Sequence, residues 1–191
     1  MPRAAAALLR PLLVLVLTLG LSLGLQLAVA PVVEAALTTN SYDGNIYALY
    51  AGNGSLVPPR SSLAQALAAH RPVVVVYYLD DDAASKRFAP VVSELQRLWG
   101  NQIELIPLTT DLLQNRPDRG PTDPAHYWKG QLPQVVVFNA EGRVLFDQSG
   151  PVPLAGINQA LSEATGMALP ADLAGGDLRS FNELNAEVVN R

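Results

Sequence analysis

One run of seven residues constrains the fold of this chain more than any other feature. From Val73 to Leu79 the sequence reads Val-Val-Val-Val-Tyr-Tyr-Leu, with no charged residue and no polar residue at alternate positions. Such a run is typical of a β-strand that is buried on both faces. Because both faces must be covered, the run predicts a central strand in a sheet with a layer of helices on each side.

Helix and strand patterns continue along the chain in a regular order. Apolar residues at spacings of three and four predict an amphipathic helix from Ala83 to Trp99. With the strands on either side, it forms a β-α-β unit, whose strands are parallel and whose crossover is right-handed. We expect the remaining elements to be an edge strand at 46–51, a helix at 63–70, a strand at 103–108, hairpin strands at 135–138 and 143–146, and helices at 154–164 and within 180–189. This order predicts an α/β fold with a mixed sheet between helices.

The N-terminal region carries a long apolar segment. Residues 11–33 contain no charged side chain, and two arginines precede them. The segment is long enough to cross a bilayer, which takes about 20 apolar residues as helix. A basic start before an apolar run is also the pattern of a secretory signal. Cleavage after Ala30 would place Pro31 next to the cut, which we expect to block it. We therefore expect an uncleaved anchor helix, with a removed signal peptide as the alternative.

Composition divides the chain into four parts. Residues 1–36 form the anchor or signal segment, and residues 37–60 form an irregular lead-in rich in Asn, Gly, Ser and Tyr. The folded domain is expected at 61–166, and residues 167–191 form a tail. The two arginines before the apolar segment favour a cytoplasmic N-terminus, which would place the other three parts across the membrane.

The chain of 191 residues contains no cysteine and two histidines. The absence of thiols excludes disulfides, thiol–disulfide exchange and Cys-ligated metal sites. We expect no metal centre and no cofactor. The 13 basic residues do not cluster and are outnumbered by 17 acidic ones, so nucleic acid is not an expected partner and an anionic lipid surface should attract the domain weakly.

The start of the long helix resembles that of the thioredoxin family. In those proteins a buried strand leads into Cys-x-x-Cys-Lys, and a proline follows four residues after the lysine. Here Lys86 and Pro90 follow the Val-rich strand at that spacing, which places Asp82-Ala83-Ala84-Ser85 on the redox motif. Asp82 and Ser85 stand where the two cysteines would be, and neither side chain can attack sulfur as a thiolate does.

A second match lies before the hairpin. Leu132-Pro133-Gln134 matches the loop proline of the same family, which is cis in known members. The resemblance covers residues 61–165 and implies a thioredoxin-like three-layer fold without redox activity. Thioredoxin relatives use the surface at this proline to dock extended polypeptide, which makes Pro133 a candidate binding residue, although a plain trans entry into the strand is the alternative.

Three further stretches narrow the resemblance. They are Tyr50–Pro59 (YAGNGSLVPP), Tyr78–Asp81 (YLDD) and Ser180–Asn185 (SFNELN). Together with the N-terminal apolar segment they resemble the cyanobacterial thylakoid membrane photosystem I accumulation factor family. The resemblance implies a non-enzymatic thylakoid membrane protein that helps photosystem I to accumulate. Its soluble part would be lumenal, and its partners would be photosystem I subunits or other assembly factors.

We expect partner contact at one composite face. Its members are Asp82, Ala83, Ala84, Ser85, Pro133, Tyr127 and Trp128. Aromatic residues in a loop are typical interface anchors, although the two here would equally serve to cover the sheet. The acidic run that ends at Asp82 offers oxygen ligands for a cation, but capping of the helix N-terminus is the simpler role.

Two other functions remain open at this stage. A lumenal or periplasmic hydrolase would use Asp82, Ser85 and His126, with the histidine supplied by the polar connection at 110–130. A generic thioredoxin-fold binding module of the plasma membrane or periplasm would have no link to photosynthesis.

Overall fold

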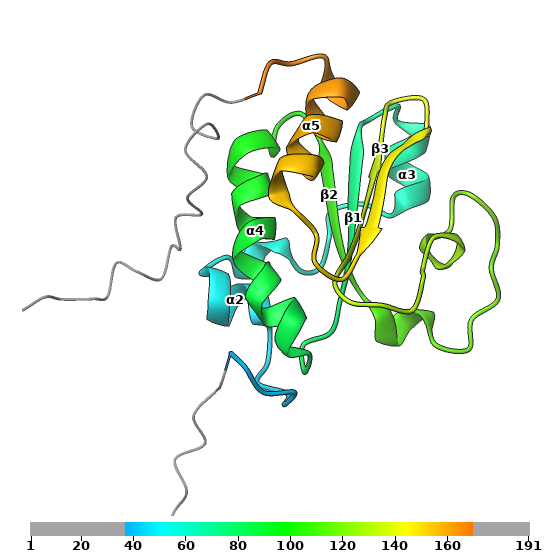
Figure 1. Cartoon of the computed structure of the whole chain (residues 1–191). Helices are drawn as coiled ribbons and strands as arrows, with labels where there is room; N and C mark the ends of the chain where they lie inside the picture. Colours follow the sequence, from blue (N-terminus) through cyan, green and yellow to red (C-terminus); the bar gives the residue numbers. More distant parts are fainter. Residues whose placement is uncertain (1–36, 170–191) are drawn as a thin grey trace, which may run out of the picture. The chain divides into compact units, whose positions relative to one another are not determined.

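The computed structural model describes residues 37–169 (Figure 1). The expected apolar segment at 11–33 and the expected tail helix within 180–189 lie outside these residues. Within 37–169, no helix is long and apolar enough to cross a membrane. The described elements are α2 (Ile46–Ala51), η1 (Gly54–Leu56), α3 (Leu63–Ala68), β1 (Val73–Tyr78), α4 (Ala83–Trp99), β2 (Glu104–Thr109), η2 (Thr110–Leu113), η3 (Pro124–His126), β3 (Gln134–Phe138), β4 (Val144–Ser149) and α5 (Leu154–Thr165).

The four strands form one mixed sheet in the order β2-β1-β3-β4. β1 pairs with β2 in parallel, with Val73 opposite Glu104, and with β3 in antiparallel, with Val73 opposite Phe138. β3 and β4 form the antiparallel hairpin. The predicted α/β architecture is confirmed: a parallel β-α-β unit joined to a hairpin, with helices on both sides of the sheet, is a thioredoxin-like fold.

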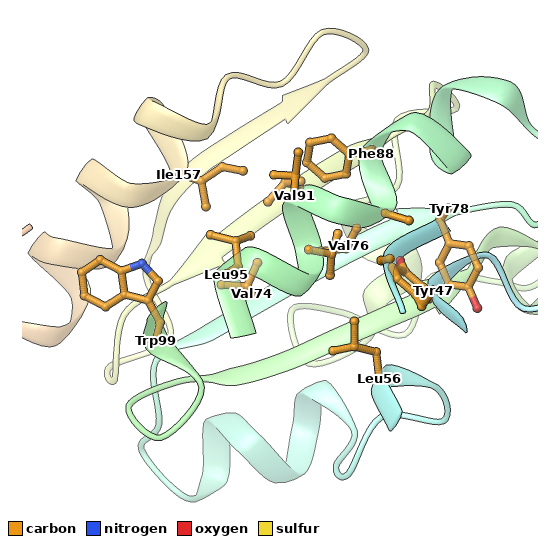
Figure 2. Close-up of a cluster of buried hydrophobic side chains, with 14 of the residues drawn as sticks. Tyr47, Leu56, Val74, Val76, Tyr78, Phe88, Val91, Leu95, Trp99 and Ile157 are labelled. Carbon is orange, nitrogen blue, oxygen red and sulfur yellow. The ribbon is translucent and has the colours of Figure 1, made fainter. Parts of the chain in front are cut away.

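The central strand supplies side chains to two separate cores. Val74 and Val76 face α4 and α5, whereas Val73 and Val75 face α3. All four are fully buried, as the uninterrupted apolar run requires. Figure 1 shows α4 and α5 on one side of the sheet and α3 on the other, and Figure 2 shows the larger core beneath α4.

The expected edge strand at 46–51 is wrong, because these residues form helix α2. Asn45 caps its N-terminus by accepting hydrogen bonds from the backbone N–H groups of Tyr47 (3.0 Å) and Ala48 (3.3 Å). Gly52 ends it in the left-handed conformation with φ 61°. Local capping and packing against α4 therefore override the preference of isoleucine and tyrosine for strands.

The lead-in at 37–60 contributes side chains to the main core. Its apolar residues Ile46, Tyr47, Ala51 and Leu56 are buried in the same cluster as the inner face of α4. Tyr47 and Leu56 appear in Figure 2 among the side chains of that core, and α2 lies alongside α4 in Figure 1. The folded domain thus begins well before the expected boundary at residue 61.

Candidate functional site

The first turn of α4 holds Asp82 and Ser85, the two residues that the thioredoxin resemblance aligns with the redox cysteines. Asp82 is the N-cap, and its carboxylate accepts hydrogen bonds from the Ser85 backbone N–H (2.6 Å) and the Ser85 hydroxyl (2.8 Å). The Ser85 hydroxyl oxygen also accepts a hydrogen bond from the Leu79 N–H (3.2 Å). Ser85 is 2% exposed. The two positions therefore form a closed polar contact that ties the strand end to the helix start.

The lead-in covers this helix start from outside. The side-chain oxygen of Asn40 accepts a hydrogen bond from the Ala83 backbone N–H (3.0 Å). An N–H in the first turn of a helix has no partner within the helix. Asn40 supplies that partner from 43 residues earlier in the chain, and Ala83 is buried.

Lys86, one residue further along α4, is fully buried. Its ammonium donates to the carbonyl oxygens of Thr39 (3.3 Å) and Ser41 (2.7 Å) and to the carboxylate of Asp43. All three N–H donors are thereby used. The ammonium also lies 5.7 Å from the ring centroid of Tyr50. We call Lys86 with Thr39, Ser41 and Asp43 the Lys86 clasp; it pins the start of the lead-in to α4.

Charge within the clasp is balanced. Hydrogen bonds from Lys86 and then from Tyr50 hold the pKa of Asp43 below its ordinary value, against the effect of burial. The Tyr50 hydroxyl donates to Asp43 at 2.8 Å. Burial, followed by this contact with a carboxylate, raises the pKa of Tyr50 to about 12. At neutral pH the clasp therefore pairs the Lys86 cation with the Asp43 carboxylate, and the neighbouring Tyr50 hydroxyl keeps its proton.

The clasp predicts a defined loss of stability in acid. Because the pKa of Asp43 is lower in the folded state, its contribution is complete above its unfolded pKa and is lost as the pH falls below about 4. Asp43→Asn should therefore be less stable than the wild type at neutral pH, and the difference should narrow below about pH 4. Urea denaturation followed by circular dichroism between about pH 7 and pH 2 measures this, and a constant difference would contradict it.

The acidic run at the end of β1 is divided among separate tasks. Asp80 accepts a hydrogen bond from the Ile46 N–H (3.1 Å) at the start of α2, Asp82 caps α4, and Asp81 is exposed. Burial raises the pKa of Asp80, and the nearby carboxylate of Asp111 adds to the effect. Within residues 37–169, no set of three or more acidic or histidine side chains is arranged to hold a metal ion.

Pro133 lies at the entry to β3, and the Leu132–Pro133 peptide bond is cis. Pro133 is buried, and its carbonyl accepts a hydrogen bond from the Gly150 N–H (2.8 Å). The next residue, Gln134, is also buried and donates through its side chain to the carbonyl of Tyr127 (2.7 Å). The cis peptide that the thioredoxin resemblance implies is thus present, within a hydrogen-bonded loop.

The aromatic pair in the polar connection covers the sheet. The Trp128 ring packs against the Tyr77 ring at a tilt, with the ring centroids 5.4 Å apart. The Tyr127 and Phe138 rings pack edge to face, with their centroids 4.9 Å apart. Both packing partners belong to the core on the α3 side of the sheet. Tyr127 and Trp128 remain half-buried. These contacts fit the covering role, and both rings stay partly open to solvent.

The three residues of the hydrolase hypothesis do not form a catalytic group. The Nδ1 of His126 pairs with Asp118 at 2.8 Å. Two hydrogen bonds lower the pKa of Asp118: the larger effect comes from the Gly120 N–H and the smaller one from His126. Among the described residues His126 makes no hydrogen bond with Ser85 or Asp82, and the aromatic residue beside it packs on the face of the sheet opposite α4. Ser85 is buried and its hydroxyl donates to the N-cap carboxylate of Asp82, so His126 is not placed to activate it.

The structure also brings in residues that sequence reasoning missed. Asn40 and Asp43 lie in a stretch whose residues predict only turns, and the spacing of Lys86 and Pro90 predicts only the register of the redox motif. The one available signal was the position of Lys86 on the helix, two residues before the apolar Phe88 and three after Ala83. Nothing in the sequence indicated its partners, since two of them are backbone carbonyls.

Comparisons with known proteins give similar solved structures and a relative by sequence. No family model matches the chain. Among the solved structures that are similar, the pneumococcal exposed lipoprotein thioredoxin of Streptococcus pneumoniae has 13% identity and a TM-score of 0.41, covering 51% of this chain and 89% of that one. A thioredoxin-family thiol:disulfide interchange protein of Chlorobium tepidum has 15% identity and a TM-score of 0.37, covering 51% and 81%.

A relative by sequence is the thylakoid membrane protein slr1796 of Synechocystis. The two chains are 35% identical over 156 residues, which cover 82% of this chain and 78% of the relative. A match of this length extends beyond the thioredoxin-like core into the flanking parts of the chain. The chain belongs to the same family as this cyanobacterial thylakoid membrane protein.

Proposed function

We propose that this protein is a non-enzymatic factor of the thylakoid membrane that helps photosystem I to accumulate by binding protein partners. The apolar segment at 11–33 would anchor it, and the thioredoxin-like domain would lie on the lumenal side. The observation that carries the proposal is that the residues aligned with the thioredoxin redox motif, at the start of α4, are covered and hydrogen-bonded. Asp82 and Ser85 bond to each other, and the lead-in covers them through Asn40.

Closure of this position favours binding over catalysis. A nucleophile must reach its substrate and must have a base within hydrogen-bond reach. Ser85 is buried, its hydroxyl is held by the N-cap carboxylate of Asp82, and the chain has no thiol. A thioredoxin-like domain without a reactive nucleophile can still bind partners through its surface.

The proposed contact surface is the solvent-accessible part of the composite face. Of its seven residues, Ala83, Ser85 and Pro133 are buried. The four that solvent reaches are Asp82, Ala84, Tyr127 and Trp128. Ala84 is the most useful for a test, because it makes no side-chain hydrogen bond and lies in the first turn of α4.

A deletion strain complemented with single variants tests the proposal. Deletion should lower the photosystem I content, measured from the light-induced P700 signal per chlorophyll. His126→Ala should restore it fully, and Ser85→Ala should do so despite a stability loss of about 1 kcal/mol from the lost hydroxyl contacts. Ala84→Arg should restore it poorly, because a large cation would then occupy the contact surface.

Immunoblots establish that each variant reaches the wild-type level. An unchanged photosystem I content after deletion would overturn the proposed role. Loss of function in His126→Ala at a normal protein level would favour the hydrolase instead.

A further inference from the structure

The lead-in presents apolar side chains on its outer surface as well as its inner one. Leu37, Tyr42 and Leu49 are 41%, 76% and 43% exposed. They are three of the seven large apolar side chains that are exposed within residues 37–169. Leu49 also lies against the turn at Gly44, where an added Cβ would be 3.7 Å from its Cδ1. We call Leu37, Tyr42 and Leu49 the outer lead-in surface.

Chain length limits how far this surface can lie from the apolar segment. That segment ends at Val33, and Leu37 is four residues later. An extended chain spans at most about 3.6 Å per residue, so the two are separated by at most about 14 Å. The Lys86 clasp fixes the lead-in to the domain from Thr39 onward. A domain anchored through 11–33 is therefore held with its lead-in close to the bilayer surface.

The charges that contact the lead-in indicate which kind of lipid surface fits. Asp80 bonds to the start of α2, and Asp43 belongs to the lead-in itself. Residues 37–49, which hold the outer lead-in surface, contain no basic residue, and the cation that contacts them, Lys86, is fully buried and paired. The exposed Arg60 lies at the other end of the lead-in sequence. Carboxylates without accessible cations are not attracted to anionic headgroups. A tyrosine flanked by leucines suits the interface of an uncharged bilayer, where amphipathic rings concentrate.

We infer that the outer lead-in surface inserts into the headgroup region of an uncharged lipid bilayer, so that the lead-in end of the domain faces the membrane. The inference rests on the membrane anchoring in the proposed function. The opposite end of the sheet then points away from the membrane. It carries the β3–β4 turn, since Phe138 pairs with Val73 at the first residue of β1.

The absence of cysteine allows a direct test with single labels on the full chain. Thr38→Cys places a fluorophore beside the outer lead-in surface, and Glu141→Cys places one in the exposed β3–β4 turn as the matched control. Both proteins are reconstituted into phosphatidylcholine vesicles that contain a lipid with a spin-labelled headgroup. We expect at least threefold stronger quenching at 38 than at 141.

Two further arms define what would overturn the inference. Tyr42→Glu with Leu49→Glu should reduce the quenching at position 38 at least twofold, and added phosphatidylglycerol should not increase it. Equal quenching at the two sites in protein that floats with the vesicles, or no effect of the double substitution, would overturn the inference alone. Failure of the full chain to float with the vesicles would overturn the anchoring as well, which separates the two outcomes.

Discussion

A chain of residues 61–191 is expected not to fold, whereas residues 37–191 should fold and unfold cooperatively. Truncation removes Ile46, Tyr47 and Leu56, which are 0%, 1% and 4% exposed in the main core. Burial of each side chain contributes about 1.5 to 3 kcal/mol, so the three together account for a large share of the about 5 to 15 kcal/mol of a typical domain. The truncation also exposes Lys86 and the side of α4 that packs against α2.

Far-UV circular dichroism with urea titration measures this expectation. The longer chain should give a single transition, and the shorter one should lack a folded baseline. A cooperative transition of residues 61–191 with a midpoint close to that of residues 37–191 would show that the lead-in is dispensable. The boundary expected at residue 61 from sequence would then stand.

Lys86→Met is expected to lower the free energy of unfolding by about 3 kcal/mol, the lower end of the range for breaking a buried ion pair by removing one partner. Methionine keeps most of the volume but supplies none of the three hydrogen bonds that the ammonium donates. The loss leaves Asp43 without its cation and two carbonyls without their donor. Urea denaturation at neutral pH gives the value.

The neighbouring residue provides a matched control. Arg87 is exposed on the same turn of α4, so Arg87→Met should change the free energy of unfolding by less than about 0.5 kcal/mol. Adding Asp43→Leu to Lys86→Met should recover part of the lost stability, because the unpaired carboxylate is removed as well. A loss below about 1 kcal/mol in Lys86→Met would show that the clasp contributes little to folding.

The central part of the fold could be predicted because its signals are local. The run beginning at Val73 is buried on both faces as its composition requires, and the predicted helix of 83–99 coincides with α4. Helix α2 was missed because six residues are too short to show a helical period, and its isoleucine and tyrosines favour strands. Asn45 before it and Gly52 after it were the available helix signals.

The sequence predicts where the candidate site residues lie along the helix, but it does not predict which residues they contact. The spacing of Lys86 and Pro90 placed Asp82 and Ser85 correctly on the helix start. The burial of Lys86 could not be foreseen, because lysine is rarely buried unless paired and its partners lie about 45 residues earlier. Every residue has a backbone carbonyl, so the sequence cannot indicate which carbonyls accept from Lys86. Only the tertiary structure shows that the lead-in covers the start of α4.

Native-state hydrogen exchange at the start of α4 tests this closure most directly. The amides of Ala83, Ser85 and Lys86 donate to Asn40, to the Asp82 side chain and to the Asp82 carbonyl respectively. If the lead-in stays on the helix start as long as the domain is folded, all three amides should exchange only through global unfolding. Their free energy of opening should then equal that of the buried amides of β1. Exchange of Ala83 at a free energy several kcal/mol lower, with β1 still protected, would show that the lead-in opens from a folded domain and would contradict the account.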